Sequence, residues 1–229
     1  MTEATLVLIG TAATVALMHT LAGPDHYLPL VILGRTENWS LKKVMGWTAL
    51  CGAGHVLSSV LVGTVGIAMG WNVSRLTWFE GIRGNIAVWA LVVFGFSYML
   101  WGIVRGVRGH GHSHGLLHAH GDKAPAHSHG PAGHSHSRTW WALFLIFILG
   151  PCEPLIPMLL IPAAEHSIFA IVAVATTFSL ITIGAMMVCV GAAYMGFELV
   201  EFGLVRRYMH AFSGFAIGAS GLLIMLIQL

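Results

Sequence analysis

Charged side chains are scarce in this chain: Asp, Glu, Lys and Arg make up 9% of its 229 residues, against 56% hydrophobic residues. A typical soluble domain is about 25% charged. The composition therefore excludes an ordinary soluble domain. The formal net charge is only +2, and we expect no nucleic-acid partner.

Cysteine is also rare. The chain has three, Cys51, Cys152 and Cys189, and their odd number and the lack of a CxxC pair argue against a disulfide framework. We interpret Cys51 and Cys189 as packing residues, since an unpaired cysteine behaves as a small buried hydrophobe. The sequence also lacks a nucleotide-binding motif. We expect neither an enzyme nor an ATP-driven pump, and no permanently bound cofactor.

Long apolar runs fill most of the chain. Runs of about 18 or more apolar residues indicate membrane-spanning helices. The sequence has six such runs, at 5–33, 44–70, 84–104, 139–163, 167–196 and 205–227. They predict an all-α, polytopic protein with six transmembrane helices, whose partner is the lipid bilayer of the plasma (inner) membrane.

Two of these runs are interrupted by helix breakers. The first contains GPDHYLP at 23–29, and the fourth contains GPCEPLIP at 150–157. Interrupted hydrophobic segments at matching positions of two halves are the best sequence indication of a transporter's binding site. We predict two three-helix repeats, 1–104 and 139–229, with broken first and fourth helices. Three spans per half make the repeats inverted.

The 105–138 segment between the halves is rich in histidine. Its other residues are mostly Gly, Ser, Ala and Pro, so we predict a disordered loop. Histidine-rich tracts indicate metal binding, although a flexible linker with incidental histidines is the alternative. The nine histidines are His110, His112, His114, His118, His120, His127, His129, His134 and His136.

Lys and Arg are distributed unevenly among the predicted loops. Nine lie in the 34–43, 105–138 and 197–207 segments, whereas only Arg75 and Arg83 lie on the other side. Positive charge marks cytoplasmic loops. We therefore expect a cytoplasmic histidine-rich loop and both termini outside.

Four ionisable residues fall inside the first two spans: His19, Asp25, His26 and His55. Ionisable residues within a membrane are costly and usually functional. Imidazole suits nickel, copper, zinc and iron, whereas hard cations prefer oxygen ligands. We predict that these four residues are metal ligands from the first half. His55 taken alone could instead hydrogen-bond a neighbouring helix.

The second break offers Cys152 and Glu153, which match Asp25 and His26 by position. If a pseudo-two-fold axis relates the halves, the two pairs approach each other near the midplane. Their mixed donor set would suit a divalent first-row metal. Alternatively, Cys152 is only a small residue in a tight turn, and Glu153 carries protons.

Small residues recur at helical spacing in the last two spans. Gly214 and Gly218 form such a face in the last span, and Gly184 and Gly191 form one in the fifth. Small residues let membrane helices approach closely. We predict that both faces pack against other helices.

The motifs of the first half carry a family resemblance. HTLAGPDH at 19–26, Gly54-His55 on the next helix and the histidine-rich loop before the fourth span resemble the nickel/cobalt transporter superfamily. Its first-helix signature has two histidines, and in the importers an acidic residue precedes the second, as Asp25 precedes His26. The spacing from His19 is one residue longer than usual, and Gly23-Pro24 reverses the Pro-Gly order of the exporters. The resemblance implies a six-helix plan and nickel or cobalt as substrate.

A second, more distant resemblance is carried by GPC at 150–152, which is similar to membrane carriers of thiol equivalents. Those carriers need a redox cysteine in each half. Here Asp25 stands at the first-half position, so a thiol relay would lack its partner.

Together these features predict a secondary transporter of a divalent transition-metal ion that works by alternating access. The expected cargo is Ni²⁺ or Co²⁺, with Zn²⁺ and Fe²⁺ as further candidates, and a cytoplasmic histidine-rich loop favours export. One alternative is a sulfite- or organic-anion exporter, although Asp25 and Glu153 would repel an anion. The other is a non-transporting, metal-binding membrane accessory protein.

Overall fold

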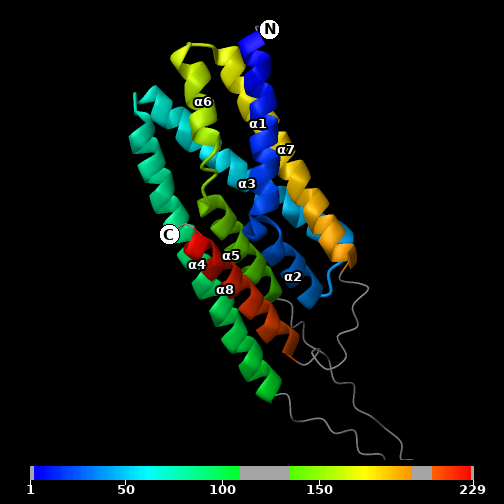
Figure 1. Ribbon diagram of the computed structural model, residues 1–229. Helices are drawn as coiled ribbons and strands as arrows, with labels where there is room; N and C mark the ends of the chain where they lie inside the picture. Colours follow the sequence, from blue (N-terminus) through cyan, green and yellow to red (C-terminus); the bar gives the residue numbers. More distant parts are fainter. Residues whose placement is uncertain (1–2, 109–134, 197–207, 228–229) are drawn as a thin grey trace, which may run out of the picture.

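The computed structural model describes residues 3–108, 135–196 and 208–227. These parts form an all-α bundle, as predicted (Figure 1). In chain order the elements are α1 (Glu3–Ala22), the 3-10 turn η1 (Pro24–His26), α2 (Leu28–Thr36), α3 (Leu41–Ala68), α4 (Val73–Arg108), α5 (Ser135–Leu149), α6 (Leu155–Ala164), α7 (Ile168–Gly196) and α8 (Met209–Ile227).

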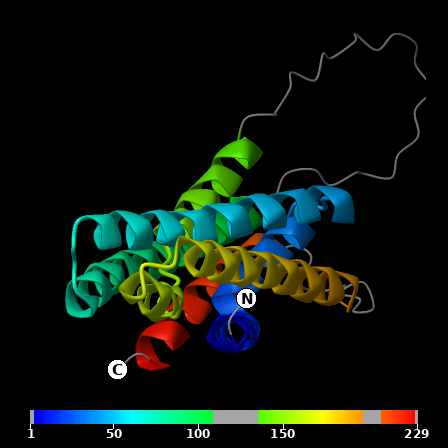
Figure 2. The same ribbon diagram turned by 90° about the horizontal axis from the view of Figure 1, so that it is seen from above.

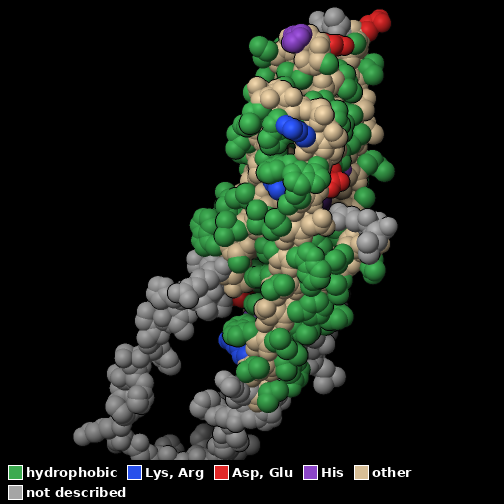
Figure 3. Space-filling view, turned by 90° about the vertical axis from the view of Figure 1, so that its left-hand side faces the viewer, with side chains coloured by type: hydrophobic (Ala, Val, Ile, Leu, Met, Phe, Trp, Pro, Cys, Tyr) green, Lys and Arg blue, Asp and Glu red, His purple; other side chains and the backbone are tan. Residues whose placement is uncertain are grey.

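Five helices in the described ranges are long and apolar enough to cross a membrane, judged by length and composition: α1, α3, α4, α7 and α8. Two shorter apolar helices, α5 and α6, stand where the fourth span is predicted. Hydrophobic side chains are spread along the face shown in Figure 3, where charged side chains are few. The chain thus has the make-up of a multi-pass membrane protein in a lipid bilayer.

Both predicted breaks are present. α1 ends at Ala22, Gly23 is extended (φ −93°, ψ 94°), and the single turn η1 follows before α2 begins. The second break lies between α5 and α6. Prolines account for both, because proline has no N–H to donate and disfavours a helical conformation in the residue before it. Each half thus consists of a broken segment followed by two helices, while the inverted relation between the halves stays a prediction.

Three predicted boundaries are wrong. α4 begins at Val73, not at 84, so Arg83 is a buried residue of a 36-residue helix and not part of a loop. α4 also continues to Arg108, and α5 already begins at Ser135, so helix covers both ends of the segment predicted to be disordered. An isolated Arg does not stop a helix, since its intrinsic helix propensity is close to that of Leu. The cytoplasmic location of the loop stays a prediction. Because Arg83 lies in a helix, it no longer counts among the loop charges on the opposite side.

Two apolar cores divide the bundle. The α2–α5 core joins α2, α3, α4, α5, α7 and α8 around Trp140, and the α1–α6 core joins α1, α3, α6 and α7 around Phe178. Along α3, Cys51 belongs to the first core and Val56 to the second. In Figure 2, α1 is seen end-on, whereas α3 and α7 cross the view side by side and so incline strongly to α1. The residues between the cores form a layer in which polar groups are buried.

Small residues bring α4 and α8 into close contact. A Cβ atom on Gly95 of α4 would lie 2.2 Å from the backbone nitrogen of Gly218. A Cβ atom on Gly214 would lie equally close to a backbone nitrogen of α4. The packing role predicted for Gly214 and Gly218 is therefore confirmed. In the fifth span, a Cβ on Gly184 would meet nothing within 4 Å among the described residues, and one on Gly191 would meet its nearest atom at 3.8 Å. The packing predicted for Gly184 is therefore wrong, whereas Gly191 packs against Met45 of α3 at an ordinary van der Waals distance.

Candidate metal site

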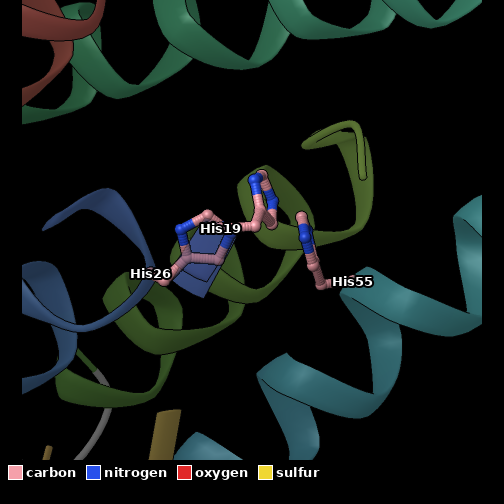
Figure 4. Close-up of side chains that lie close together, drawn as sticks. All are labelled: His19, His26 and His55. Carbon is pink, nitrogen blue, oxygen red and sulfur yellow. The ribbon is translucent and has the colours of Figure 1, made fainter. Parts of the chain in front are cut away.

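Three histidines meet in the layer between the two cores. His19 lies in the last turn of α1, His26 ends η1, and His55 lies midway along α3. One ring nitrogen from each lies within 4.8 Å of the others. The ring centroids are 4.8 Å apart for His19 and His26 and 5.1 Å for His26 and His55, and both pairs are edge-on (Figure 4). We call these residues the three-histidine group.

The first break is what brings His19 and His26 together. In an unbroken helix, residues seven positions apart are separated by about 10 Å along the axis. The extended Gly23 and the turn after it fold His26 back toward α1. A Cβ atom on residue 23 would lie 2.5 Å from His26 Nδ1 and 2.8 Å from Asp25 Oδ1. Only glycine therefore fits at this position without moving the imidazole.

The hydrogen bonds of His26 assign its tautomer. Its Nδ1 lies 3.1 Å from the carbonyl oxygen of Gly23 and 3.2 Å from Asp25 Oδ1. Both oxygens accept hydrogen bonds, so Nδ1 carries the proton and donates it. In the neutral ring, Nε2 then keeps its lone pair.

His55 is oriented by the second break. Its Nδ1 lies 3.2 Å from the carbonyl oxygen of Phe147 in the last turn of α5. The usual helical donor to this carbonyl would be the N–H of residue 151, which is Pro151 and has none. Gly150 N also approaches the Phe147 oxygen, at 3.2 Å, but a carbonyl can accept twice. The Pro151 break thus supplies an acceptor that fixes the proton of His55 on Nδ1.

The three Nε2 atoms complete the case for a cation. Each is buried and has no hydrogen-bond partner within the described ranges. Buried polar atoms normally have partners, so three orphaned nitrogens in one place call for an explanation. Imidazole nitrogens bind a tetrahedral zinc ion at about 2.0 Å, which sets them about 3.3 Å apart. One ring nitrogen from each histidine already lies within 4.8 Å of the others, so the group needs to contract by about 1.5 Å to bind an ion in this way.

Asp25 lies at the site, where its carboxylate is next to the ring of His26. Its carboxylate contacts His26 Nδ1 and not Nε2, which has no hydrogen-bond partner among the described residues. Its side chain is 35% exposed, whereas that of His26 is 5% exposed. Metal-binding histidines commonly donate their second N–H to a carboxylate or a carbonyl, which orients the ring and raises its basicity. Asp25 and Gly23 occupy these two positions.

Cys152 and Glu153 do not join the three-histidine group. Cys152 is fully buried in the α1–α6 core, and its backbone N–H donates to Ser59 Oγ at 3.0 Å. Glu153 is exposed to a cavity of about 330 Å³ that the three histidines and Asp25 also line. The second break thus contributes a carboxylate to the same space, at a position separate from the imidazoles.

The histidine-rich loop lies mostly outside the described residues. That holds for the first eight of its nine histidines, His110 to His134, and for the side chain of His136, which is in the first turn of α5. Their predicted metal binding stays a prediction.

Sequence reasoning missed a buried ion pair beside the second break. Glu80 is 0% exposed and Arg83 9% exposed on α4, and Arg83 Nη1 donates to Glu80 Oε1. Opposite charges three residues apart face each other on a helix. The three-residue spacing of Glu80 and Arg83 could have indicated an ion pair on a helix. Because charged residues are also typical of loops, the sequence instead suggested a loop.

Comparisons with protein-family models, with curated proteins and with solved structures give no match. The nickel/cobalt transporter superfamily therefore stays a resemblance, carried by the sequence motifs alone.

Proposed function

We propose that this protein is a membrane transporter of a divalent transition-metal ion, with Ni²⁺ or Co²⁺ as the foremost cargo. The observation that carries the proposal is the set of three buried Nε2 atoms without partners, one from each histidine of the group. Imidazole nitrogen suits late first-row metals. Zn²⁺ and Fe²⁺ fit the same donors.

The location of the group supports transport over storage. It lies between two apolar cores, at a break in a membrane-type helix. Irregular backbone at membrane depth is tolerated where it is enclosed by protein or lines a cavity. In secondary transporters, such breaks form the midplane site around which the two halves alternate in access. We propose this mechanism, with an inverted relation of the halves and export as the direction.

The charges in the cavity argue against an anion as cargo. Asp25 and Glu153 both line it, and each would repel a sulfite or an organic anion at close range. The same carboxylates favour a divalent cation, because three neutral imidazoles leave its charge uncompensated. Membership of the nickel/cobalt transporter superfamily fits this cargo and is part of the proposal.

Nickel flux in proteoliposomes tests the proposal. His55→Ala should abolish Ni²⁺ flux, because it removes one of the three donors and the link to α5. His166→Asn is the matched control, since His166 is exposed in the turn between α6 and α7 at φ 53°, a conformation that Asn tolerates. This control should transport like the wild type.

Two results would point elsewhere. Wild-type flux in His55→Ala would exclude the three-histidine group as the transport site. A wild-type protein that binds Ni²⁺ but moves none across sealed vesicles would favour the accessory protein instead.

A further inference from the structure

The Glu80–Arg83 pair on α4 is a second charged site in the apolar bundle. The side chains are 1% and 11% exposed, and the pair stands beside the second break. Charges at such a depth are rare and usually paired or functional.

Arg83 makes hydrogen bonds to three helices. It donates to Glu80, to Ser58 Oγ at 2.8 Å and to the carbonyl oxygen of Ile148 at 2.9 Å. Ile148 lies in the last turn of α5, where the helix dipole favours a cation. Arg83 therefore holds the end of α5 against α3 and α4. These acceptors and the helix dipole stabilise its positive charge.

Glu80 is only half engaged. Its Oε1 accepts from Arg83, whereas its Oε2 is buried and has no hydrogen-bond partner in the described part of the chain. Ser59 on α3 lies close enough to interact with this carboxyl group. An unsatisfied carboxylate oxygen in an apolar interior is costly, and a proton is the smallest group that removes its charge.

The formal charge of the cluster leads to the same conclusion. The titratable groups that interact with Glu80 are Arg83 on its own helix and Glu153 and Cys152 in the second break. The Glu153 carboxylate stands beside Gly84, with Oε1 3.8 Å from the position of a Cβ on that glycine. With both carboxylates ionised and Cys152 as a thiol, the cluster carries one net negative charge. One proton makes it neutral.

One member of this cluster, Glu153, lines the same cavity as the three-histidine group, whereas Glu80 and Arg83 are not among its lining residues. A divalent ion that enters the cavity makes ionised carboxylates more favourable and a bound proton less so. By linkage, a proton bound at the cluster weakens metal binding by the same factor.

We propose that Glu80, paired with Arg83 beside the second break, is the proton-carrying group that couples metal movement to a proton gradient. Metal entry releases the proton of the Glu80 carboxylic acid as H⁺ to water, and metal exit lets the carboxylate take one up. This inference rests on the proposed transport function and deepens it to metal/proton exchange.

The test uses Glu80→Gln in the full chain, because the amide imitates a carboxylic acid that cannot release its proton. Arg83 and Glu153 then balance each other's charge. The variant should bind Ni²⁺ and catalyse Ni²⁺/Ni²⁺ exchange across proteoliposomes like the wild type. It should lose accumulation of Ni²⁺ driven by an imposed pH gradient. Glu165→Gln is the control, since Glu165 is an exposed carboxylate at the end of α6, and it should leave all three readouts unchanged.

Each other outcome has a defined meaning. Gradient-driven accumulation at the wild-type level in Glu80→Gln overturns the proposal, as does loss of Ni²⁺ binding, which would make Glu80 a support of the metal site. A wild-type protein that transports Ni²⁺ without response to a pH gradient overturns the coupling but leaves the transport function standing. Absence of Ni²⁺ binding by the wild type overturns the transport function itself. If Glu80→Gln does not assemble, Glu80→Asp should keep coupling with a shifted pH dependence, and an unshifted one contradicts the proposal.

Discussion

Asp25→Asn separates a carboxylate that orients a histidine from one that binds the metal. The substitution keeps an oxygen that can accept from His26 Nδ1 but removes the negative charge. Loss of an outer-shell partner typically costs 10- to 100-fold in metal affinity. The carbonyl oxygen of Gly23, 3.1 Å from the same nitrogen, remains as a second acceptor. We therefore expect the lower end of this range, about tenfold, or about 1.4 kcal/mol.

The assay is a Ni²⁺ titration of the purified, detergent-solubilised protein against a competing chelator, with Asp25→Asn and His26→Ala measured side by side. His26→Ala removes a donor nitrogen and should weaken binding by more than 100-fold, beyond the outer-shell range. Glu165→Gln removes a carboxylate away from the site and should leave the affinity unchanged. A loss in Asp25→Asn as large as that in His26→Ala would refute the reasoning, because Asp25 would then behave as a direct ligand.

Three further predictions concern packing, the second break and the loop. Gly95→Ala should destabilise the detergent-solubilised protein by about 1–3 kcal/mol through overpacking against α8. Gly81→Ala on the same helix should not destabilise the protein, because its Cβ would meet no atom of the described residues within 4 Å. Thermal unfolding measures both variants. Cys152→Ala should leave Ni²⁺ affinity unchanged, since the thiol is in an apolar core, and a loss in the chelator titration would restore it as a ligand. Deletion of 110–136 should lower the number of weakly bound Ni²⁺ ions in equilibrium dialysis but keep the tight one, and loss of the tight ion would move the site into the loop.

The first half of the site could be predicted because its signals are local. Gly23 and Pro24 mark the break, and His19, His26 and His55 stand out in apolar runs where ionisable residues are rare. The sequence does not show that the break turns His26 back onto His19, since this depends on the extended conformation of Gly23. It also cannot show that the Asp25 carboxylate and the Gly23 carbonyl oxygen both lie beside His26 Nδ1, so the prediction that Asp25 is a ligand stays a prediction.

The second half could not be predicted because its contribution is made by the backbone and by tertiary contacts. The residues that stand out, Cys152 and Glu153, lie apart from the imidazoles. The group that contacts His55 is the carbonyl of Phe147, and every residue has a carbonyl. Arg83 was placed in a loop because it is charged, yet its partners on three helices bury it.

The central claim is that the three histidines bind one metal ion within the bundle. Bound Ni²⁺ per polypeptide, measured by equilibrium dialysis of the purified wild-type protein and of His19→Ala, His26→Ala and His55→Ala, tests it most directly. Because the histidine-rich loop is the same in all four proteins, its ions cancel in the comparison. We predict that each variant binds one ion fewer than the wild type, and that this ion is the most tightly held. Equal numbers and affinities in all four proteins would contradict the account.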